Sequence, residues 1–183
     1  MNKLFVLLII GVPLLCSLNA FAGNKEEKGE INQHIKRFAL VDKNLYRGAQ
    51  PDEKGLELLK EYGIKKIINL RGEKKLVERE RAQVEALGME YVNIPWTIWG
   101  TPYNPEIFAR FFKAIRDKDT KPVFFHCKRG SERTGVLGAA YKIHYQDLSL
   151  DEALANAKQY DIKFIWWPFV KSKIKNFAEQ YNQ

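Results

Sequence analysis

Apolar and polar positions follow two different periods along this chain, and the period changes from one segment to the next. Short runs rich in Val, Ile, Leu and Phe, such as 65–70 and 122–125, are typical of strands. The second run is apolar throughout, as expected for a strand at the centre of a sheet. Between such runs, apolar residues recur at helical spacing within charged segments. The pattern predicts strands at 45–47, 65–70, 89–94 and 122–125, and helices at 52–62, at 73–87, from Pro105, at 134–145, after Ser149 and from Pro168.

Strands that alternate with helices predict the fold class. They favour a mainly parallel, twisted sheet flanked by helices, in a single α/β domain that we assign to residues 38–183. The stretch 95–104 contains two prolines, one glycine and two tryptophans, which predicts a loop between a strand and a helix.

The first 22 residues have the three parts of a secretory signal peptide. They comprise Lys3, an apolar run over 4–15 and a small-x-small ending at Ala22. That run is shorter than the roughly 20 residues of a membrane-spanning helix, which disfavours an anchor. We expect cleavage after Ala22, export to the periplasm or secretion, and no stable membrane insertion afterwards. Residues 23–37 open with a charged run, and we expect them to form a flexible leader.

Composition excludes several classes of protein. A chain of 183 residues with 45% hydrophobic residues is neither a disordered tail nor a multi-span membrane protein. The net charge of +8 comes without the basic and aromatic interleaving of single-strand binders, so we expect no nucleic-acid partner. Two cysteines are too few for a disulfide-built scaffold. Cleavage after Ala22 removes Cys16 and leaves Cys127 without an intramolecular partner. A lipid anchor on Cys16 is disfavoured by the bulky Leu15 before it.

The chemistry is concentrated in residues 126–135, His-Cys-Lys-Arg-Gly-Ser-Glu-Arg-Thr-Gly, which we call the Cys127 loop. It joins a predicted apolar strand directly to a predicted helix, and five residues separate Cys127 from Arg133. Such a turn can point successive backbone N–H groups inward, and these donors form an anion site with the helix N-terminus. The Arg133 guanidinium can hold two phosphate oxygens. The same cations and helix end favour the thiolate form of Cys127, so a nucleophile would lie beneath a bound phosphoryl group.

The other members of the Cys127 loop have supporting roles in this interpretation. We expect Thr134 to give its hydroxyl to the sulfur and His126 to bond behind the loop. A bare Cys-x5-Arg pattern is more often a core cysteine and a surface cation, but here the strand, the glycines and the helix occur in register with it. The residues expected to bind phosphate are Lys128, Arg129, Gly130, Ser131, Glu132 and Arg133.

On these residues, the Cys127 loop resembles the signature loop of the cysteine-based protein tyrosine phosphatases. The chain from about 38 to 177 is similar to their compact dual-specificity branch. The segments 45–51 and 67–71 resemble openings of exported bacterial members and of atypical plant and fungal phosphatases. The resemblance implies attack of Cys127 on phosphorus, a phosphocysteine intermediate and its hydrolysis, with no metal or other cofactor. The implied substrate is a phosphotyrosine or phosphoserine/threonine protein, or a small phosphorylated metabolite.

One part implied by the resemblance is missing from its expected place. These enzymes place an aspartate on a loop equivalent to 95–104, where it protonates the leaving oxygen. There is no Asp or Glu from Tyr91 to Pro105. Glu106 and Glu132 are the nearest candidates, but the first turn of a helix is the favoured explanation of Glu106, and Glu132 could simply temper the charge of the loop.

The missing aspartate leaves several alternatives open. The acid is relocated, the substrate has a good leaving group, as in inositol pyrophosphates, or the enzyme is weak. A phosphate-binding pseudophosphatase is a further alternative. A rhodanese-like sulfurtransferase is disfavoured by the sequence Arg133-Thr134-Gly135.

Two further groups of residues allow a functional and a structural interpretation. Trp96 and Trp99 either stack against a substrate or pack in the core and its rim. Four cations either form a basic entrance to the loop or are ordinary surface charge: Arg47, Arg71, Lys128 and Arg129.

Overall fold

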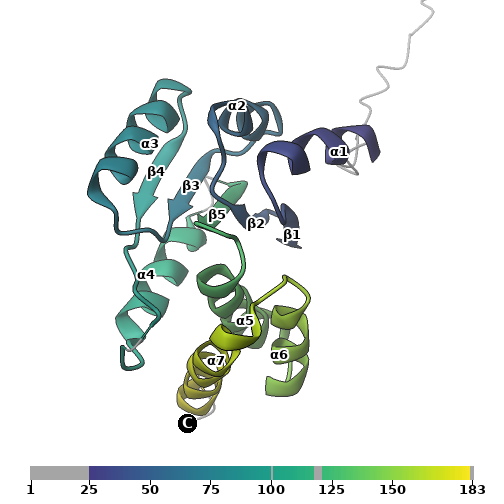
Figure 1. Ribbon diagram of the computed structural model, residues 1–183, viewed down its shortest axis with the longest axis vertical. Helices are drawn as coiled ribbons and strands as arrows, with labels where there is room; N and C mark the ends of the chain where they lie inside the picture. Colours follow the sequence, from purple (N-terminus) through teal and green to yellow (C-terminus); the bar gives the residue numbers. More distant parts are fainter. Residues whose placement is uncertain (1–24, 100, 118–120, 182–183) are drawn as a thin grey trace, which may run out of the picture.

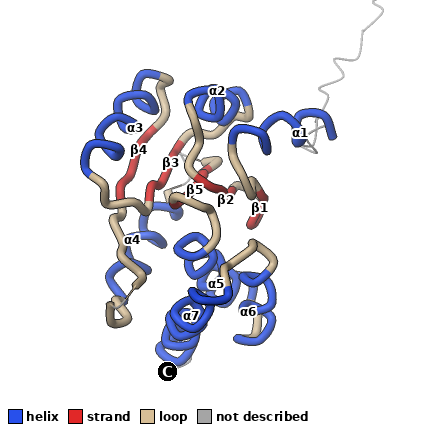
Figure 2. The backbone as a smooth tube through the Cα atoms, viewed as in Figure 1, coloured by secondary structure: helices blue, strands red, loops and turns tan. Residues whose placement is uncertain are grey.

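A computed structural model of the chain describes residues 25–99, 101–117 and 121–181. They form one five-stranded sheet in the order β1-β2-β5-β3-β4 (Figures 1 and 2). β1 pairs antiparallel with β2, and all other neighbours are parallel, which confirms the mainly parallel α/β sheet. The strands are β1 (Ala39–Asp42), β2 (Leu45–Ala49), β3 (Lys66–Asn69), β4 (Glu90–Asn93) and β5 (Val123–Cys127).

The six helices predicted from the sequence lie close to their expected positions, because the residues that cap several of them are local signals. Asp52 accepts a hydrogen bond from the Gly55 N–H, Asn104 caps the Glu106 N–H, and Ser149 forms a capping box with its own helix. The described helices are α1 (Lys25–His34), α2 (Glu53–Glu61), α3 (Lys74–Ala86), α4 (Pro105–Arg116), α5 (Glu132–Gln146), α6 (Leu150–Lys158), the 3-10 turn η1 (Phe164–Trp166) and α7 (Trp167–Tyr181).

The helices cover both faces of the sheet, so it separates two hydrophobic cores (Figure 1). α1, α2 and α3 lie on one face, and α4, α5, α6 and α7 lie on the other. Because side chains alternate along a strand, β5 sends Phe125 and Cys127 into the α5 core and Phe124 into the α2 core. The same alternation puts His126 on the face opposite Cys127.

The prediction of a flexible leader over residues 23–37 is wrong for the part that the structure describes. Residues 25–34 form α1, and Ile31 and Ile35 one turn apart are buried in the α2 core. Ile35 is 0% exposed and lies so close to β2 that a Cβ on Gly48 would come within 2.7 Å of its side chain. The charged composition of the segment concealed this apolar pair.

The proposed signal peptide, residues 1–22, lies outside the described residues. Within the part of the chain that the structure describes, no helix has the length and apolar character needed to cross a membrane. β1 was not predicted, because its four residues carry no clear alternation.

The packing of α1 predicts a specific cost of mutation. Ile35→Ala removes a fully buried side chain and should lower the free energy of unfolding by about 2–5 kcal/mol. Leu40→Ala is the matched control, because Leu40 is 56% exposed and should cost no more than about 0.5 kcal/mol. Urea titration measures both values, and equal costs would contradict the packed position of α1.

Candidate active site

The Cys127 loop lies at the carboxyl edge of the sheet, between the ends of β2 and β3. Cys127 is the last residue of β5 and pairs with Ala49 on β2, while His126 pairs with Asn69 on β3. Four residues separate Cys127 from Glu132, where α5 begins, so the loop opens directly into a helix N-terminus, as predicted. Cys127 is 1% exposed, and its Sγ lies 3.7 Å from the Thr134 Oγ1. The structure therefore brings Thr134 to the sulfur.

The path of the loop depends on Gly130. Its φ of +73° lies in the left-handed region, and a Cβ there would come within 2.5 Å of the Ala49 nitrogen. The loop therefore rests directly on the end of β2, where the Gln50 N–H donates to the Lys128 carbonyl at 3.4 Å. Only glycine gives both the backbone angle and the space for this close approach.

Arg47 is buried under the Cys127 loop and holds it through hydrogen bonds. It is therefore not part of a basic entrance. It is buried in β2, where its Nη2 donates to the Gly130 carbonyl at 2.5 Å and to the Thr134 Oγ1 at 3.2 Å. Its guanidinium lies 3.6 Å from the centre of the Tyr160 ring. Burial lowers the pKa of Arg47 to about 10, and Tyr160 and Cys127 oppose that effect, so the side chain stays cationic at neutral pH. The Thr134 hydroxyl therefore lies between the positively charged Arg47 guanidinium and the Cys127 sulfur.

Arg133 lies on the other side of the loop and is oriented by backbone carbonyls. Its Nη1 donates to the Leu70 carbonyl at 3.0 Å and to the Trp96 carbonyl at 3.2 Å. The side chain lines a cavity of about 330 Å³, which we call the Arg133 cavity. The other lining residues are Gly72, Glu73, Trp96, Thr97 and Trp99.

The two tryptophans are packed residues that also form a wall of this cavity. Trp96 is buried against Phe108 in the α5 core. Trp99 stacks on Trp166 with ring centres 4.2 Å apart, and further along the loop the Lys173 Nζ donates to the Thr101 carbonyl. Trp99 is therefore held against η1 by an aromatic contact, and Thr101 is held against α7 by a hydrogen bond.

The carboxylate among the lining residues, Glu73, is a poor proton donor. Arg71 binds it with two parallel hydrogen bonds, Nε to Oε2 at 3.0 Å and Nη2 to Oε1 at 2.8 Å. These bonds outweigh partial burial and lower the pKa of Glu73 to about 2. Glu73 is therefore ionised at neutral pH.

The two carboxylates that the sequence offered as proton donors, Glu106 and Glu132, do not lie at the Arg133 cavity. Glu106 is exposed in the first turn of α4 and is not one of the lining residues of the Arg133 cavity. Glu132 is buried and forms an ion pair with Arg129 at 3.0 Å. The structure thus places Glu132 within the loop as a partner of a cation.

The four cations expected at the entrance have different environments. Arg47 is buried beneath the loop, Arg71 is buried beside Glu73, and Arg129 pairs with Glu132 while its carbonyl accepts from Arg37. Lys128 is exposed at the start of the loop. Two of the four, Arg47 and Arg71, are therefore structural, which corrects the entrance hypothesis for them.

Behind the loop, His126 faces a buried carboxylate that the sequence analysis missed. The Nε2 of His126 lies 3.3 Å from the Oε1 of Glu80 on α3, and both side chains are buried. Glu80 also accepts hydrogen bonds from Tyr91 Oη at 2.8 Å, from Asn69 and from Gln50. Burial raises the pKa of Glu80, but His126 and these donors outweigh it, so the pKa is lowered overall. Glu80 lies in the stripe of Val77 and Val84 on α3, and a carboxylate among apolar positions was the available signal.

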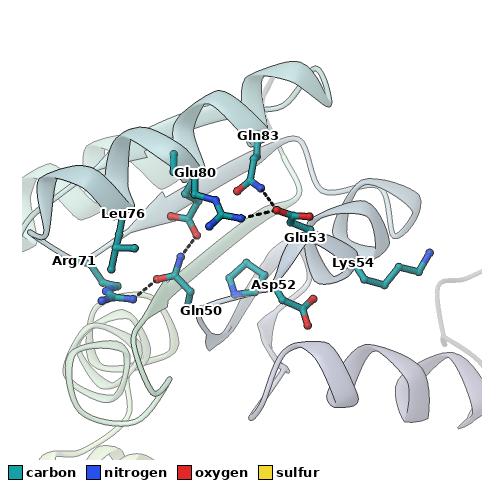
Figure 3. Close-up of a pocket in the computed structure, with 10 residues that line it drawn as sticks. Gln50, Asp52, Glu53, Lys54, Arg71, Leu76, Glu80 and Gln83 are labelled. Carbon is teal, nitrogen blue, oxygen red and sulfur yellow. Dashed lines mark hydrogen bonds and ion pairs between the residues drawn. The ribbon is translucent and has the colours of Figure 1, made fainter.

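Gln50 links this buried group to the residues at the Arg133 cavity. Figure 3 shows Gln50 between Glu80 and Arg71, with one end of its amide turned to each. The Arg71 Nη1 donates to the Gln50 Oε1 at 2.8 Å, and Arg71 in turn binds Glu73. A hydrogen-bonded chain therefore runs from the back of the loop to the cavity wall.

The larger pocket in Figure 3, about 640 Å³, does not resemble a site for a polyanion. Its lining holds three carboxylates and three cations, and Arg79 is already paired with Glu53 at 2.6 Å. In the described parts of the chain, no three His, Cys, Asp or Glu side chains gather as a metal site. The charged residues that line the pocket are Asp52, Glu53, Lys54, Arg71, Arg79 and Glu80.

The Glu80 environment predicts how stability depends on pH. A lowered folded-state pKa adds stability above the unfolded value of about 4.3, and that stability is lost as the pH falls through the folded pKa. Glu80→Gln should lower the free energy of unfolding by about 1–3 kcal/mol at pH 7, and the difference from the original protein should shrink on acidification. Glu85→Gln on the exposed side of α3 is the control, with little change at any pH. A difference for Glu80→Gln that stays constant down to pH 3 would contradict this assignment.

Comparison with known proteins places the chain in a family. The family model described as "PTP-NADK: DSP-PTPase phosphatase fused to NAD+ Kinase" matches residues 24–165. A probable tyrosine-protein phosphatase from Dictyostelium discoideum, DG1060, is 31% identical over 119 residues, 61% of this chain and 69% of that protein. Inositol diphosphatase DSP4 from Arabidopsis thaliana is 30% identical over 155 residues, 75% of this chain and 74% of that protein. The crystal structure of TpbA from P. aeruginosa has the same fold, with a TM-score of 0.66 at 18% identity over 80% of this chain and 91% of the other. The chain belongs to the dual-specificity branch of the cysteine-based protein tyrosine phosphatases and is a phosphatase.

Proposed function

We propose that this phosphatase transfers the phosphoryl group of an ester with a good leaving group to Cys127, and from there to water. In the first step the thiolate forms an S–P bond while the bond from phosphorus to the leaving oxygen breaks. In the second step a water oxygen bonds to phosphorus, the S–P bond breaks, and inorganic phosphate leaves. The buried sulfur at the N-terminus of α5, 3.7 Å from the Thr134 hydroxyl, supports this role.

Arg133 and the loop N–H groups would hold the phosphoryl oxygens during both steps. Residues 128–133 contribute the amides, and Arg133 is oriented for this role by its bonds to Leu70 and Trp96. Such donors act most strongly on the charge that develops in the transition state. Arg47 and Thr134 would stabilise the sulfur as attacking group and as leaving group, because the arginine donates to the hydroxyl beside it.

The observation that carries the preference for a good leaving group is the state of Glu73. It is the carboxylate among the residues that line the Arg133 cavity, and Arg71 keeps it ionised with a pKa of about 2. A leaving oxygen that receives no proton departs more easily as a phenolate, with a conjugate acid near pKa 10, than as a serine alkoxide. Phosphotyrosine is therefore the favoured protein substrate over phosphoserine and phosphothreonine. The aromatic wall of Trp96 and Trp99 and the Dictyostelium tyrosine-phosphatase relative support the same preference.

A phosphoanhydride in an inositol pyrophosphate is the second candidate substrate. Its leaving group is a phosphate, which departs more easily than a phenolate and needs no acid. The Arabidopsis relative is named an inositol diphosphatase, which supports this alternative. A panel that contains a phosphotyrosyl peptide, a phosphoseryl peptide and an inositol pyrophosphate would separate the two candidates by kcat/KM.

We also propose that residues 1–22 direct export and that the enzyme acts in the periplasm or outside the cell. The apolar run and the ending at Ala22 support this. Expression in a bacterium, fractionation and mass determination of the chain would test it. A chain that retains residues 1–22 and stays in the cytoplasm would contradict export.

Replacement of the nucleophile tests the chemistry directly. Cys127→Ser should lower the turnover of an aryl phosphate by at least about 10³-fold, because the alcohol is a far weaker nucleophile than the thiolate. Binding of inorganic vanadate or phosphate should persist, since the loop amides and Arg133 remain. Undiminished turnover in the variant would exclude the phosphocysteine route. Binding by both proteins without turnover by either would identify a pseudophosphatase.

A series of aryl and alkyl phosphates tests the absence of an effective acid. We expect kcat/KM to fall steeply as the pKa of the leaving group rises, because no group protonates the leaving oxygen. Glu106→Gln should leave that slope unchanged, as should Glu73→Gln. A shallow slope in the original protein that becomes steep in Glu106→Gln would show that Glu106 is the acid after all.

A further inference from the structure

The connection from α6 to α7, residues 159–166, borders the Cys127 loop, where the Arg129 Nη2 donates to the Asp161 carbonyl at 3.5 Å. Tyr160 lies beneath the Arg47 guanidinium, and Asp161 pairs with Arg37, which itself holds the Arg129 carbonyl. A Cβ on Gly135 would lie 3.4 Å from Ile162. The first part of the connection, Tyr160 to Ile162, therefore packs against the Cys127 loop and the residues that hold it.

At the end of this connection two large apolar side chains point into solvent. Phe164 is 92% exposed and Ile165 is 64% exposed, and we call this pair the apolar tip. The next residue, Trp166, turns inward and stacks on Trp99 of the Arg133 cavity, with Phe169 beside them. The tip is thus held outward by a packed aromatic contact and lies next to the cavity. Clustered apolar exposure of this kind marks an interaction surface.

Lysines outnumber carboxylates around the tip: the segment 158–172 holds Lys158, Lys163 and Lys171 against the single carboxylate Asp161. The segment 162–172 contains Lys163 and Lys171 and no Asp or Glu. Both lysines are exposed, and the Lys158 Nζ lies 5.9 Å from the centre of the Trp167 ring. The nearest carboxylate in sequence, Asp161, is paired with Arg37. A partner of this surface must therefore accept apolar side chains and carry negative charge.

We propose that the apolar tip docks on an anionic lipid surface, with Phe164 and Ile165 in the headgroup and acyl boundary and Lys163 and Lys171 at the lipid phosphates. Aromatic and aliphatic side chains between lysines are the composition of interfacial membrane anchors. Through the contact of Trp166 with Trp99, docking would place the Arg133 cavity beside the membrane surface. This inference goes beyond the proposed hydrolysis and does not depend on it.

Shape favours a lipid surface over a substrate peptide. A peptide side chain binds in a concave site, whereas Phe164 projects almost fully into solvent and offers no groove. A second copy of the chain is disfavoured because the same lysines would face each other across a symmetric contact.

Vesicle partitioning tests the proposal. The purified chain is titrated with vesicles of phosphatidylcholine alone and of equal parts phosphatidylcholine and phosphatidylglycerol, and the partition coefficient is measured by sedimentation. We expect preference for the anionic vesicles, a loss of at least about tenfold in Phe164→Ser/Ile165→Ser, and a loss of about fivefold each in Lys163→Glu and Lys171→Glu. All variants are compared with the same N-terminus, so that any contribution of residues 1–22 to the partition coefficient is common to them.

Matched variants show whether the effect belongs to this surface. Leu40→Ser and Lys75→Glu make the same kinds of change at exposed positions elsewhere and should leave partitioning unaltered. Hydrolysis of a soluble aryl phosphate should be equal in the original protein and in Phe164→Ser/Ile165→Ser, so failure of docking and failure of the proposed chemistry are distinguished.

Three results would overturn the proposal. The first is an equal partition coefficient for the original chain and Phe164→Ser/Ile165→Ser. The second is a tip variant that raises KM only for a phosphopeptide, which would assign the surface to a protein substrate. The third is a dimer in sedimentation that the tip variant dissociates, which would assign it to self-association.

Discussion

The buried guanidinium of Arg47 is the constraint on which the geometry of the site depends. Burial of a cation is costly unless hydrogen bonds compensate for lost water, and here the Nη2 donates to the Gly130 carbonyl and the Thr134 hydroxyl. The Tyr160 ring covers its face. One side chain of β2 therefore joins the Cys127 loop, the first turn of α5 and the end of α6. A lysine would provide charge without the planar group that bonds at its edge and stacks at its face.

A second polar group stabilises the loop from the opposite face of the sheet. Glu80 is ionised in the α2 core because Tyr91, Asn69 and Gln50 donate to it and His126 lies beside it. Removal of any partner would leave a buried charge with fewer hydrogen bonds. Cys127 and His126, adjacent in sequence, thus face different buried charges on opposite sides of the sheet: Arg47 bonds to Thr134 beside Cys127, and Glu80 lies beside His126.

These two groups hold the Cys127 loop from both faces of the sheet, beside a cavity whose carboxylate, Glu73, is a poor proton donor. The segment that would bear an aspartate is instead packed through Trp96 and Trp99, and the carboxylate at the cavity is bound to Arg71. The arrangement favours positioning and charge stabilisation of the phosphoryl group over protonation of the leaving oxygen.

Local signals in the sequence determined the alternation of strands and helices from Leu45 onward, the mainly parallel sheet and the turn from Cys127 to Arg133. Periodicity, capping residues and the Cys-x5-Arg-Thr-Gly pattern are short-range features that do not depend on distant contacts. Tertiary structure alone decided which charges are buried. From the sequence, Arg47 was either an entrance cation or ordinary surface charge and Glu80 was not singled out, whereas the fold buries Arg47 under the Cys127 loop and Glu80 behind it. Likewise, the charged leader became a helix because Ile31 and Ile35 meet the α2 core. Whether a side chain is solvated or buried depends on residues far away in the chain, and sequence spacing does not specify those neighbours.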